Sequence, residues 1–257
     1  MTHPYFTGSR YPRILAHRGL PSRGEDPAAW ENTAAAFAAA HAAGAEYIET
    51  DCRVTADGDV VLFHDERLQR LFDDPRTVDQ VRTRELAELM APHGGLLTVG
   101  EALTGFPNSR FNIDVKSDAA ATRIGPIVAP HADRVLLTSF SDARRRRAIR
   151  GAVSAGAEVA PAASGGRDTI ARLRTLSALR LSPTRLLQGI DAIQIPLRYG
   201  PAKVFTQALL RAANRHDVEV HVWTINDPQT MLRLVSAGVD GIVTDRADLA
   251  LTALSPT

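Results

Sequence analysis

The feature that constrains this sequence most is a repeated unit in which a short apolar strand is followed by a loop and a helix. Strands that alternate with helices form parallel sheets, and about 250 residues is the usual length of a closed barrel of eight such units. We therefore predict an α/β fold, a TIM or (β/α)8 barrel. Its strands are expected at residues 14–16, 47–54, 111–115, 134–138, 158–161, 192–195, 219–223 and 241–244.

One hairpin is added to this pattern after the second strand. The residues Ala56-Asp57-Gly58-Asp59 favour a tight turn into a further strand at 60–63. No linker or change in composition divides the chain, because Ser164-Gly165-Gly166 is long enough only for a loop. We expect one domain over residues 1–257, with its core at about 13–250. Helices are expected at 34–43, 84–90, 98–103, 119–128, 143–150, 169–179, 203–214, 228–236 and 247–254.

Composition excludes several classes of protein. The net charge of +1 gives no global field that would attract nucleic acid or an anionic membrane. The single cysteine, Cys52, rules out a disulfide within the chain and allows a reducing compartment. The first residues lack an apolar signal segment, and no window approaches the roughly 20 apolar residues of a membrane span. We expect a cytoplasmic protein without integral membrane association; its oligomeric state is left open.

Carboxylates at the predicted strand ends indicate a metal site. Glu49 and Asp51 are two residues apart on one strand, so their side chains point to the same face. Two carboxylates inside a barrel repel each other and are costly to desolvate, and a divalent cation removes both problems. Oxygen ligands favour Mg²⁺ or Ca²⁺. Asp114, at the end of the next barrel strand, is a candidate third ligand.

Two histidines flank these carboxylates. His17 follows the first strand and His64 follows the added hairpin. Their ordinary pKa suits proton transfer near neutral pH, so they are candidates either for a general acid and base or for metal ligands. The other histidines are expected on helices, loops or strand starts, where a structural role is favoured.

Basic and aromatic residues complete this predicted site. Arg18 and Lys116 place positive charge on the same rim, which suits a phosphate, and Lys116 is one of only two lysines in the chain. Trp223, at the end of a later strand, is assigned either to the core or to a wall against an apolar part of the substrate, and the wall is favoured. Glu31 and Asn32 precede a helix and are assigned either to its cap or to the site.

The ordered set of motifs resembles the glycerophosphodiester phosphodiesterase family over residues 13–250. Beside His17-Arg18-Gly19, it comprises Glu31-Asn32-Thr33, Glu49-x-Asp51, Thr55-x-Asp57-Gly58 with His64-Asp65, Phe111 to Lys116, Ser139-Phe140, Trp223 to Asn226, and Gly238 to Asp245.

The resemblance implies a (β/α)8 barrel that uses a divalent metal to hydrolyse glycerophosphodiesters to glycerol 3-phosphate and an alcohol. It assigns Glu49, Asp51 and Asp114 to the metal, His17 and His64 to acid-base catalysis, and Arg18 and Lys116 to the phosphate. The family commonly has glutamate where Asp114 stands, which leaves the coordination geometry open. The segment between His64 and Phe111 is also short, as in compact bacterial forms.

Three alternatives remain from the sequence. A lysophospholipase-D-like or sphingomyelinase-D-like enzyme could use the same barrel on a lysophospholipid. The Glu49-x-Asp51 pair and the Trp223-Thr224-Ile225-Asn226 motif count against a phosphoinositide-cleaving phospholipase C. A catalytically silent phosphodiester-binding barrel would be expected to lack a histidine or both carboxylates, and this chain has them.

Overall fold

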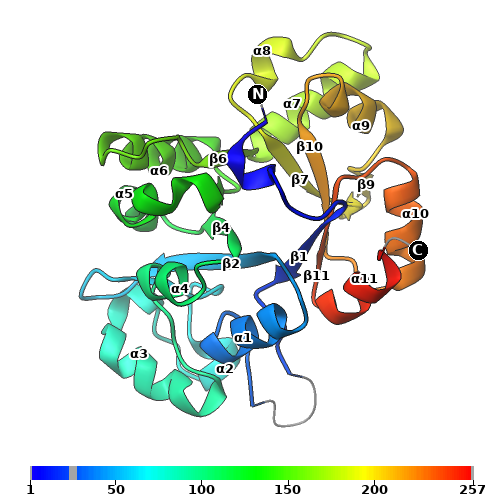
Figure 1. Cartoon of the computed structure of the whole chain (residues 1–257). Coiled ribbons are helices and arrows are strands. Elements are labelled where there is room, and N and C mark those ends of the chain that lie inside the picture. Colours follow the sequence, from blue (N-terminus) through cyan, green and yellow to red (C-terminus); the bar gives the residue numbers. More distant parts are fainter. Residues whose placement is uncertain (1, 23–27, 256–257) are drawn as a thin grey trace.

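The computed structural model describes residues 2–22 and 28–255 and shows a closed barrel of parallel strands surrounded by helices (Figure 1). Within this part of the chain the barrel has eight strands, and the first pairs with both the last and the second. The predicted TIM barrel is therefore confirmed. The barrel strands are β1 Arg13–His17, β2 Tyr47–Val54, β4 Arg110–Val115, β5 Val135–Thr138, β6 Ala162–Gly165, β7 Ala192–Pro196, β10 Glu219–Trp223 and β11 Gly241–Thr244.

The predicted hairpin after β2 is also present. The strand β3 (Val60–Leu62) pairs antiparallel with the end of β2, outside the closed barrel. Gly58 has a φ of +97° at the turn, a conformation that glycine adopts without steric cost. This hairpin leads the chain back to the mouth of the barrel, where His64 follows.

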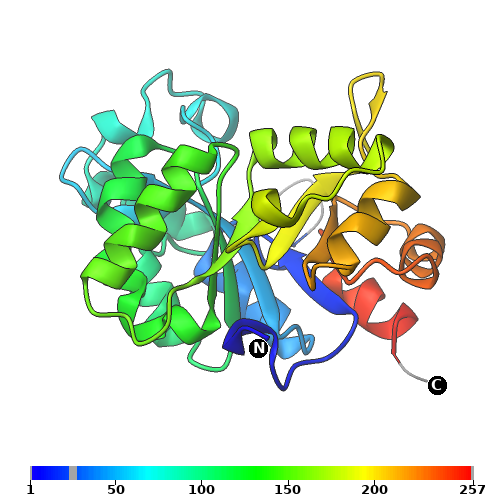
Figure 2. The same cartoon turned by 90° about the horizontal axis from the view of Figure 1, so that it is seen from above.

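Helices cover the outside of the barrel (Figures 1 and 2). Several begin at a side-chain cap: Thr33, Ser117 and Ser141 each accept a hydrogen bond from a backbone N–H of the first turn. The helices are α1 Ala34–Ala42, α2 Gln69–Phe72, α3 Thr83–Met90, α4 Val99–Gly105, α5 Asp118–Val128, α6 Asp142–Ser154, α7 Arg167–Ala178, α8 Thr184–Leu187, α9 Gln207–Asn214, α10 Pro228–Ser236 and α11 Ala247–Ala253.

The N-terminal end of the barrel is closed by the chain's own first residues. The short 3-10 helix η1 (Pro4–Phe6) buries Tyr5 and Phe6 completely or nearly so, against residues such as Leu15 and Tyr47. The cavity described below opens at the opposite end, where the strands finish.

The fifth barrel strand was predicted wrongly at Glu158–Pro161, because it lies at Ala162–Gly165. Pro161 has no N–H to donate to a central strand, whereas the small residues of β6 give little hydrophobic signal in the sequence. They are required by packing: a Cβ on Gly165 would come within 2.7 Å of Thr169 on the helix that follows.

The helix predicted at 203–214 begins later, at Gln207, where Thr206 caps it. The residues before it form a second small hairpin, β8 (Arg198–Tyr199) and β9 (Ala202–Lys203), with a turn at Gly200-Pro201. This hairpin stands away from the barrel (Figure 2). In the described residues, no helix has the length and apolar character needed to cross a membrane.

Candidate active site

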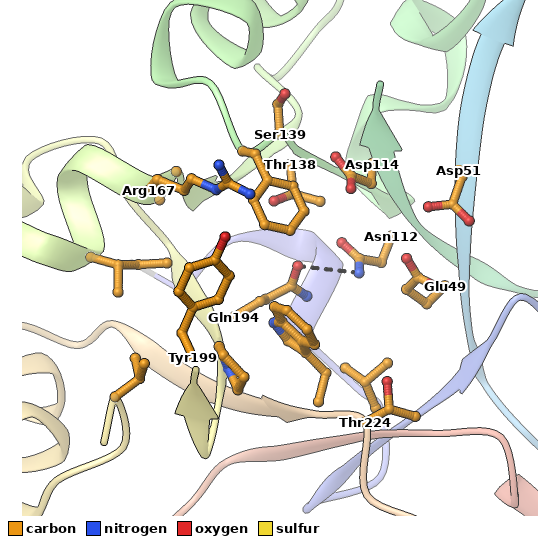
Figure 3. Close-up of a pocket in the computed structure, with 18 of the residues that line it drawn as sticks. Glu49, Asp51, Asn112, Asp114, Thr138, Ser139, Arg167, Gln194, Tyr199 and Thr224 are labelled. Carbon is orange, nitrogen blue, oxygen red and sulfur yellow. Dashed lines mark hydrogen bonds between the residues drawn. The ribbon is translucent and has the colours of Figure 1, made fainter. Parts of the chain in front are cut away.

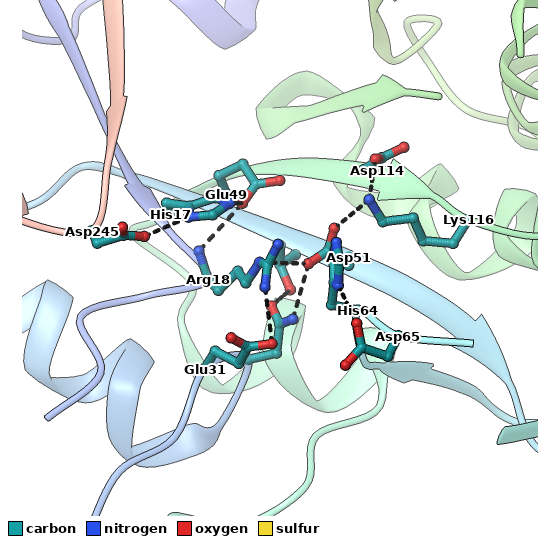
Figure 4. A network of polar contacts seen from close by, with 12 residues as sticks. His17, Arg18, Glu31, Glu49, Asp51, His64, Asp65, Asp114, Lys116 and Asp245 are labelled. Atoms are coloured by element: carbon teal, nitrogen blue, oxygen red, sulfur yellow. Dashed lines mark hydrogen bonds and ion pairs between the residues drawn. The ribbon is translucent and has the colours of Figure 1, made fainter. Parts of the chain in front are cut away.

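A cavity of about 460 Å³ opens at the carboxyl ends of the strands, where TIM barrels carry their active sites. It collects most of the side chains predicted from the sequence (Figures 3 and 4). We call this group the polar end of the cavity. Its members are His17, Arg18, Glu49, Asp51, His64, Asp114 and Lys116.

Three carboxylates converge from two neighbouring strands. Glu49 and Asp51 project from β2, and Asp114 lies opposite Asp51 in the register of β2 and β4. All three are buried. Burial and repulsion from Asp51 raise the pKa of Glu49, and burial raises that of Asp114. Burial alone would raise the pKa of Asp51 too, but Lys116 and Arg18 lower it below its usual range.

Two cations pair with Asp51 and Asp114 in the structure. The Nζ atom of Lys116 lies 2.9 Å from Asp51 Oδ1 and 2.6 Å from Asp114 Oδ2. The Nε atom of Arg18 lies 3.2 Å from Asp51 Oδ2. Positive charge thus lies on both sides of Asp51. The same two residues, Arg18 and Lys116, are the candidates for holding a phosphate.

The loop after β1 is folded around the site by local backbone conformation. Arg18 and Asn32 both have positive φ values, 57° and 59°, and the N–H of Asn32 donates to the carbonyl of Arg18. Gly19 has no room for a side chain, because a Cβ there would lie 2.8 Å from the backbone of Ala36. This tight packing fixes the direction in which Arg18 leaves the strand.

The sequence assigned Glu31 and Asn32 either to the helix cap or to the site. In the structure both side chains point toward the site. Asn32 donates from Nδ2 to Asp51 Oδ2 at 3.0 Å, and Glu31 accepts from Arg18 at 2.9 Å. The helix cap is instead supplied by Thr33, whose hydroxyl accepts from the N–H of Ala36. Neither Glu31 nor Asn32 lines the cavity itself; each holds a residue that does.

His17 is held by a carboxylate from the other end of the sequence. Its Nδ1 lies 2.6 Å from Asp245 Oδ1, and its Nε2 lies 3.8 Å from Glu49. Asn226 donates to the second oxygen of Asp245 at 2.7 Å. Burial lowers the pKa of His17, but the hydrogen bond with Asp245 and the charge of Glu49 act in the opposite direction, and the net change is upward.

His64 has a carboxylate next to it in the sequence. Its Nδ1 lies 2.7 Å from Asp65 Oδ1. Asp65 also accepts from Arg70 on α2, and Arg70 in turn pairs with Glu31. The two histidines therefore reach the same cavity with one ring nitrogen each already engaged by an aspartate (Figure 4).

Comparison with known proteins identifies the family. The model of the glycerophosphoryl diester phosphodiesterase family matches residues 17–249. This chain belongs to that family. The resemblance inferred from the motifs is confirmed, and so is the prediction of a phosphodiesterase enzyme.

Individual relatives cover nearly the whole chain. A Mycobacterium tuberculosis protein named probable glycerophosphodiester phosphodiesterase 2 is 37% identical, covering 91% of this chain and 88% of its own length. A Thermotoga maritima glycerophosphodiester phosphodiesterase has the same fold, with a TM-score of 0.68, 24% identity and coverage of 93% and 96%. An Oleispira antarctica phosphodiesterase, solved with the product sn-glycerol-3-phosphate, matches with a TM-score of 0.70, 21% identity and coverage of 95% and 97%.

The carboxylates at the polar end of the cavity have the chemistry of a metal site. The donors are carboxylate oxygens, which suit a hard divalent cation. Asp114 Oδ1 is buried without a hydrogen-bond partner, which leaves one ligand atom unused. Among the described residues, no three His, Cys, Asp or Glu side chains close around one point, because Lys116 lies between Asp51 and Asp114. The oxygen donors therefore have the chemistry that suits a cation, but in the described residues their arrangement does not close around one, and Lys116 already pairs with two of the three carboxylates.

Several residues around the site were not selected from the sequence. Asp245 and Asn226 were quoted only as parts of motifs, although both follow barrel strands and could have been suspected for that reason. Arg70 lies in a segment without a motif and gave no signal. Trp223 lines the cavity together with Phe140, which appeared in the sequence only as part of a motif, and with Arg167 and Tyr199, which belonged to no motif.

Proposed function

We propose that this chain hydrolyses glycerophosphodiesters to glycerol 3-phosphate and an alcohol, with His17 and His64 as its acid and base. The observation that carries the proposal is the meeting of two aspartate-bound histidines with three carboxylates and two cations in one cavity. One histidine alone would allow many roles. Two of them, on opposite sides of an anion site, suit a reaction in which one proton is removed and another is donated.

The proposed reaction has two steps. One histidine takes the proton from the glycerol hydroxyl next to the phosphate, and that oxygen bonds to phosphorus. The other histidine gives a proton to the oxygen of the alcohol as its bond to phosphorus breaks. Water then opens the resulting cyclic phosphate with the two roles exchanged, and the hydroxyl is released with its proton restored.

The remaining residues bind and orient the substrate. Arg18 and Lys116 hold the phosphate oxygens, where added negative charge develops as the bonds change. Asp245 and Asp65 engage Nδ1 of His17 and of His64, which leaves the Nε2 atom of each ring for proton transfer.

Glu49, Asp51 and Asp114 would hold a divalent metal ion, Mg²⁺ or Ca²⁺. Such an ion would add positive charge beside the phosphate. The raised pKa of Glu49 means that a proton competes for this ligand more strongly than for an ordinary glutamate. We therefore expect cation binding to weaken as the pH falls.

The deciding experiment measures glycerol 3-phosphate released from glycerophosphocholine and other glycerophosphodiesters, and choline released from lysophosphatidylcholine. Each reaction is run in EDTA and after addition of Mg²⁺ or Ca²⁺. We expect glycerol 3-phosphate from the glycerophosphodiesters, and only with metal. Full activity in EDTA would refute the metal site. Faster release of choline from the lysolipid would favour the lysophospholipase-D-like alternative.

Two further expectations concern the chain as a whole. Its cytoplasmic location and its single domain stay predictions from the sequence.

A further inference from the structure

The cavity continues beyond the polar end into a second part with different chemistry. We call this part the aromatic end and define it as Phe140, Arg167, Tyr199 and Trp223. Phe140 follows β5, Arg167 is the first residue of α7, Tyr199 belongs to the β8–β9 hairpin, and Trp223 ends β10. Figure 3 shows Arg167 and Tyr199 across the cavity from Glu49 and Asp51.

Arg167 is the charged residue among these four, and Arg174 of the same helix also lines the cavity, with its Nε donating to the carbonyl of Lys203. The guanidinium carbon of Arg167 lies 4.5 Å from the centre of the Phe140 ring and 5.6 Å from that of Tyr199. Its backbone N–H donates to the carbonyl of Phe140, which ties the start of α7 to this loop. A stacked guanidinium keeps its N–H groups in the plane of the group and free for a ligand.

No acid balances this arginine within residues 2–22 and 28–255, where its side chain makes neither an ion pair nor a hydrogen bond. The acidic residues described as lining the cavity are Glu49, Asp51 and Asp114, all at the polar end. In contrast, Arg18 and Lys116 are both engaged by carboxylates. The aromatic end therefore has an uncompensated positive charge on an apolar support.

The proposed reaction decides which part of the substrate reaches this charge. The glycerol hydroxyl must lie near a histidine to be deprotonated, so the glycerol arm stays at the polar end. The phosphate is held there by Arg18 and Lys116. The alcohol arm is the part of the diester left to extend toward Phe140 and Arg167, and Lys116 Nζ lies only 5.6 Å from the centre of the Phe140 ring.

We propose that Arg167 binds an anionic group on the alcohol arm, so that the preferred substrates are glycerophosphodiesters whose alcohol carries a phosphate of its own. This inference rests on the proposed function and specifies its substrate class. A guanidinium fork matches phosphate oxygens with two parallel hydrogen bonds. The aromatic rings hold the fork in place and pack against the carbon atoms of the alcohol.

The same geometry disfavours choline. Aromatic faces attract a quaternary ammonium group, but one cation, Arg167, already lies over the rings of Phe140 and Tyr199. A choline group at the aromatic end would meet a positive charge and no carboxylate there. We therefore expect glycerophosphocholine to be the poorer substrate.

The test compares glycerophosphoinositol with glycerophosphoinositol 4-phosphate, which differ by one phosphate on the alcohol arm, and adds glycerophosphocholine. Initial rates of glycerol 3-phosphate release give kcat/KM for each. For an exposed arginine we expect about a fivefold to tenfold preference for the phosphorylated compound. This preference should shrink as salt is added, because screening weakens exposed charges.

Variants assign the preference to one side chain. Arg167→Gln should lower kcat/KM on glycerophosphoinositol 4-phosphate by about fivefold to tenfold, and on glycerophosphoinositol by less. Arg167→Lys should retain part of the preference, because the charge stays while the fork is lost. Arg172→Gln is the matched control, since Arg172 lies on the same helix but not among the residues that line the cavity. Thermal melting checks that each variant is folded.

The outcomes separate this inference from the proposed function. Equal kcat/KM for the two inositol compounds in the unmodified protein would overturn the role of Arg167 and leave the function standing. A loss in Arg167→Gln that is equal for both compounds would also overturn it, since that result indicates a structural role. Absence of glycerol 3-phosphate release from all three compounds would remove the proposed function and this inference together.

Discussion

His17 and His64 line the same cavity, and each has a carboxylate at Nδ1, at 2.6 Å for Asp245 and 2.7 Å for Asp65. The residues that bind the other side of the two carboxylates differ in charge. Asp245 is held by the neutral amide of Asn226, which adds no positive charge next to this carboxylate. Asp65 is held by Arg70, whose positive charge offsets its own.

The two pairs also stand on different parts of the molecule. His17 ends β1 and Asp245 follows β11, two strands that pair in the closed barrel. His64 and Asp65 follow the hairpin strand β3, and the Arg70 behind them is nearly half exposed. The His17–Asp245 pair, which we call the barrel pair, is thus fixed by the sheet. The His64–Asp65 pair, which we call the hairpin pair, depends on a surface ion-pair network. We expect the barrel pair to be more sensitive to loss of its aspartate.

The largest expected effect is loss of either histidine. His17→Ala and His64→Ala should each lower kcat by about 10²- to 10⁴-fold, the usual contribution of a general acid or base, while the fold stays intact. His41→Ala, an exposed position on α1, serves as the control. Near-normal turnover in either variant would contradict the acid-base assignment. The comparison of the two histidine–aspartate pairs would then no longer concern catalysis.

Loss of the aspartates should separate the two pairs. Asp245→Asn should lower kcat by on the order of 10- to 100-fold, as for a lost hydrogen bond to a charged group. Asp65→Asn should cost less, about threefold to tenfold, because Arg70 already offsets its charge. Steady-state rates of the two variants, measured side by side, decide this. Equal losses of kcat would show that the charge of the residue holding each aspartate has no effect on catalysis.

The pH dependence gives a sharper test of the barrel pair. Asp245 favours the protonated ring and contributes to the raised pKa of His17, so Asp245→Asn should lower that pKa. One limb of the kcat/KM profile should then move to lower pH. The acidic limb moves if His17 is the base, and the alkaline limb moves if it is the acid. A profile in which neither limb shifts would rule out a role for His17 as acid or base.

The smallest expected effect concerns Arg70. Its ion pairs lie at the surface, so Arg70→Gln should change kcat by no more than about fivefold. The change should become smaller at high salt, where these pairs are already screened. Arg84→Gln removes a comparable exposed pair on α3, with Glu88, and is the control. A loss of kcat as large as that of Asp245→Asn would mean that the hairpin pair depends more strongly than the barrel pair on the residues that surround it.

Much of the fold could be predicted because it is encoded locally. Seven of the eight barrel strands were placed by their apolar runs, and the turn at Gly58 marked the added hairpin. β6 was missed because Ala162–Gly165 is small rather than hydrophobic, and its position depends on how closely α7 packs against it. The β8–β9 hairpin was missed because its strands are two residues long and exposed, with no alternating pattern.

The site, like the fold, has some features that are encoded locally and others that depend on tertiary contacts. The sequence by itself determined that Glu49 and Asp51 share a face and that His64 has Asp65 beside it, because the strand period and chain connectivity require both. Only the tertiary structure decided that His17 meets Asp245, 228 residues away, since that contact exists only after β1 and β11 close the barrel. The same holds for Arg167 over Phe140 and Tyr199, which three separate loops bring together at the barrel mouth.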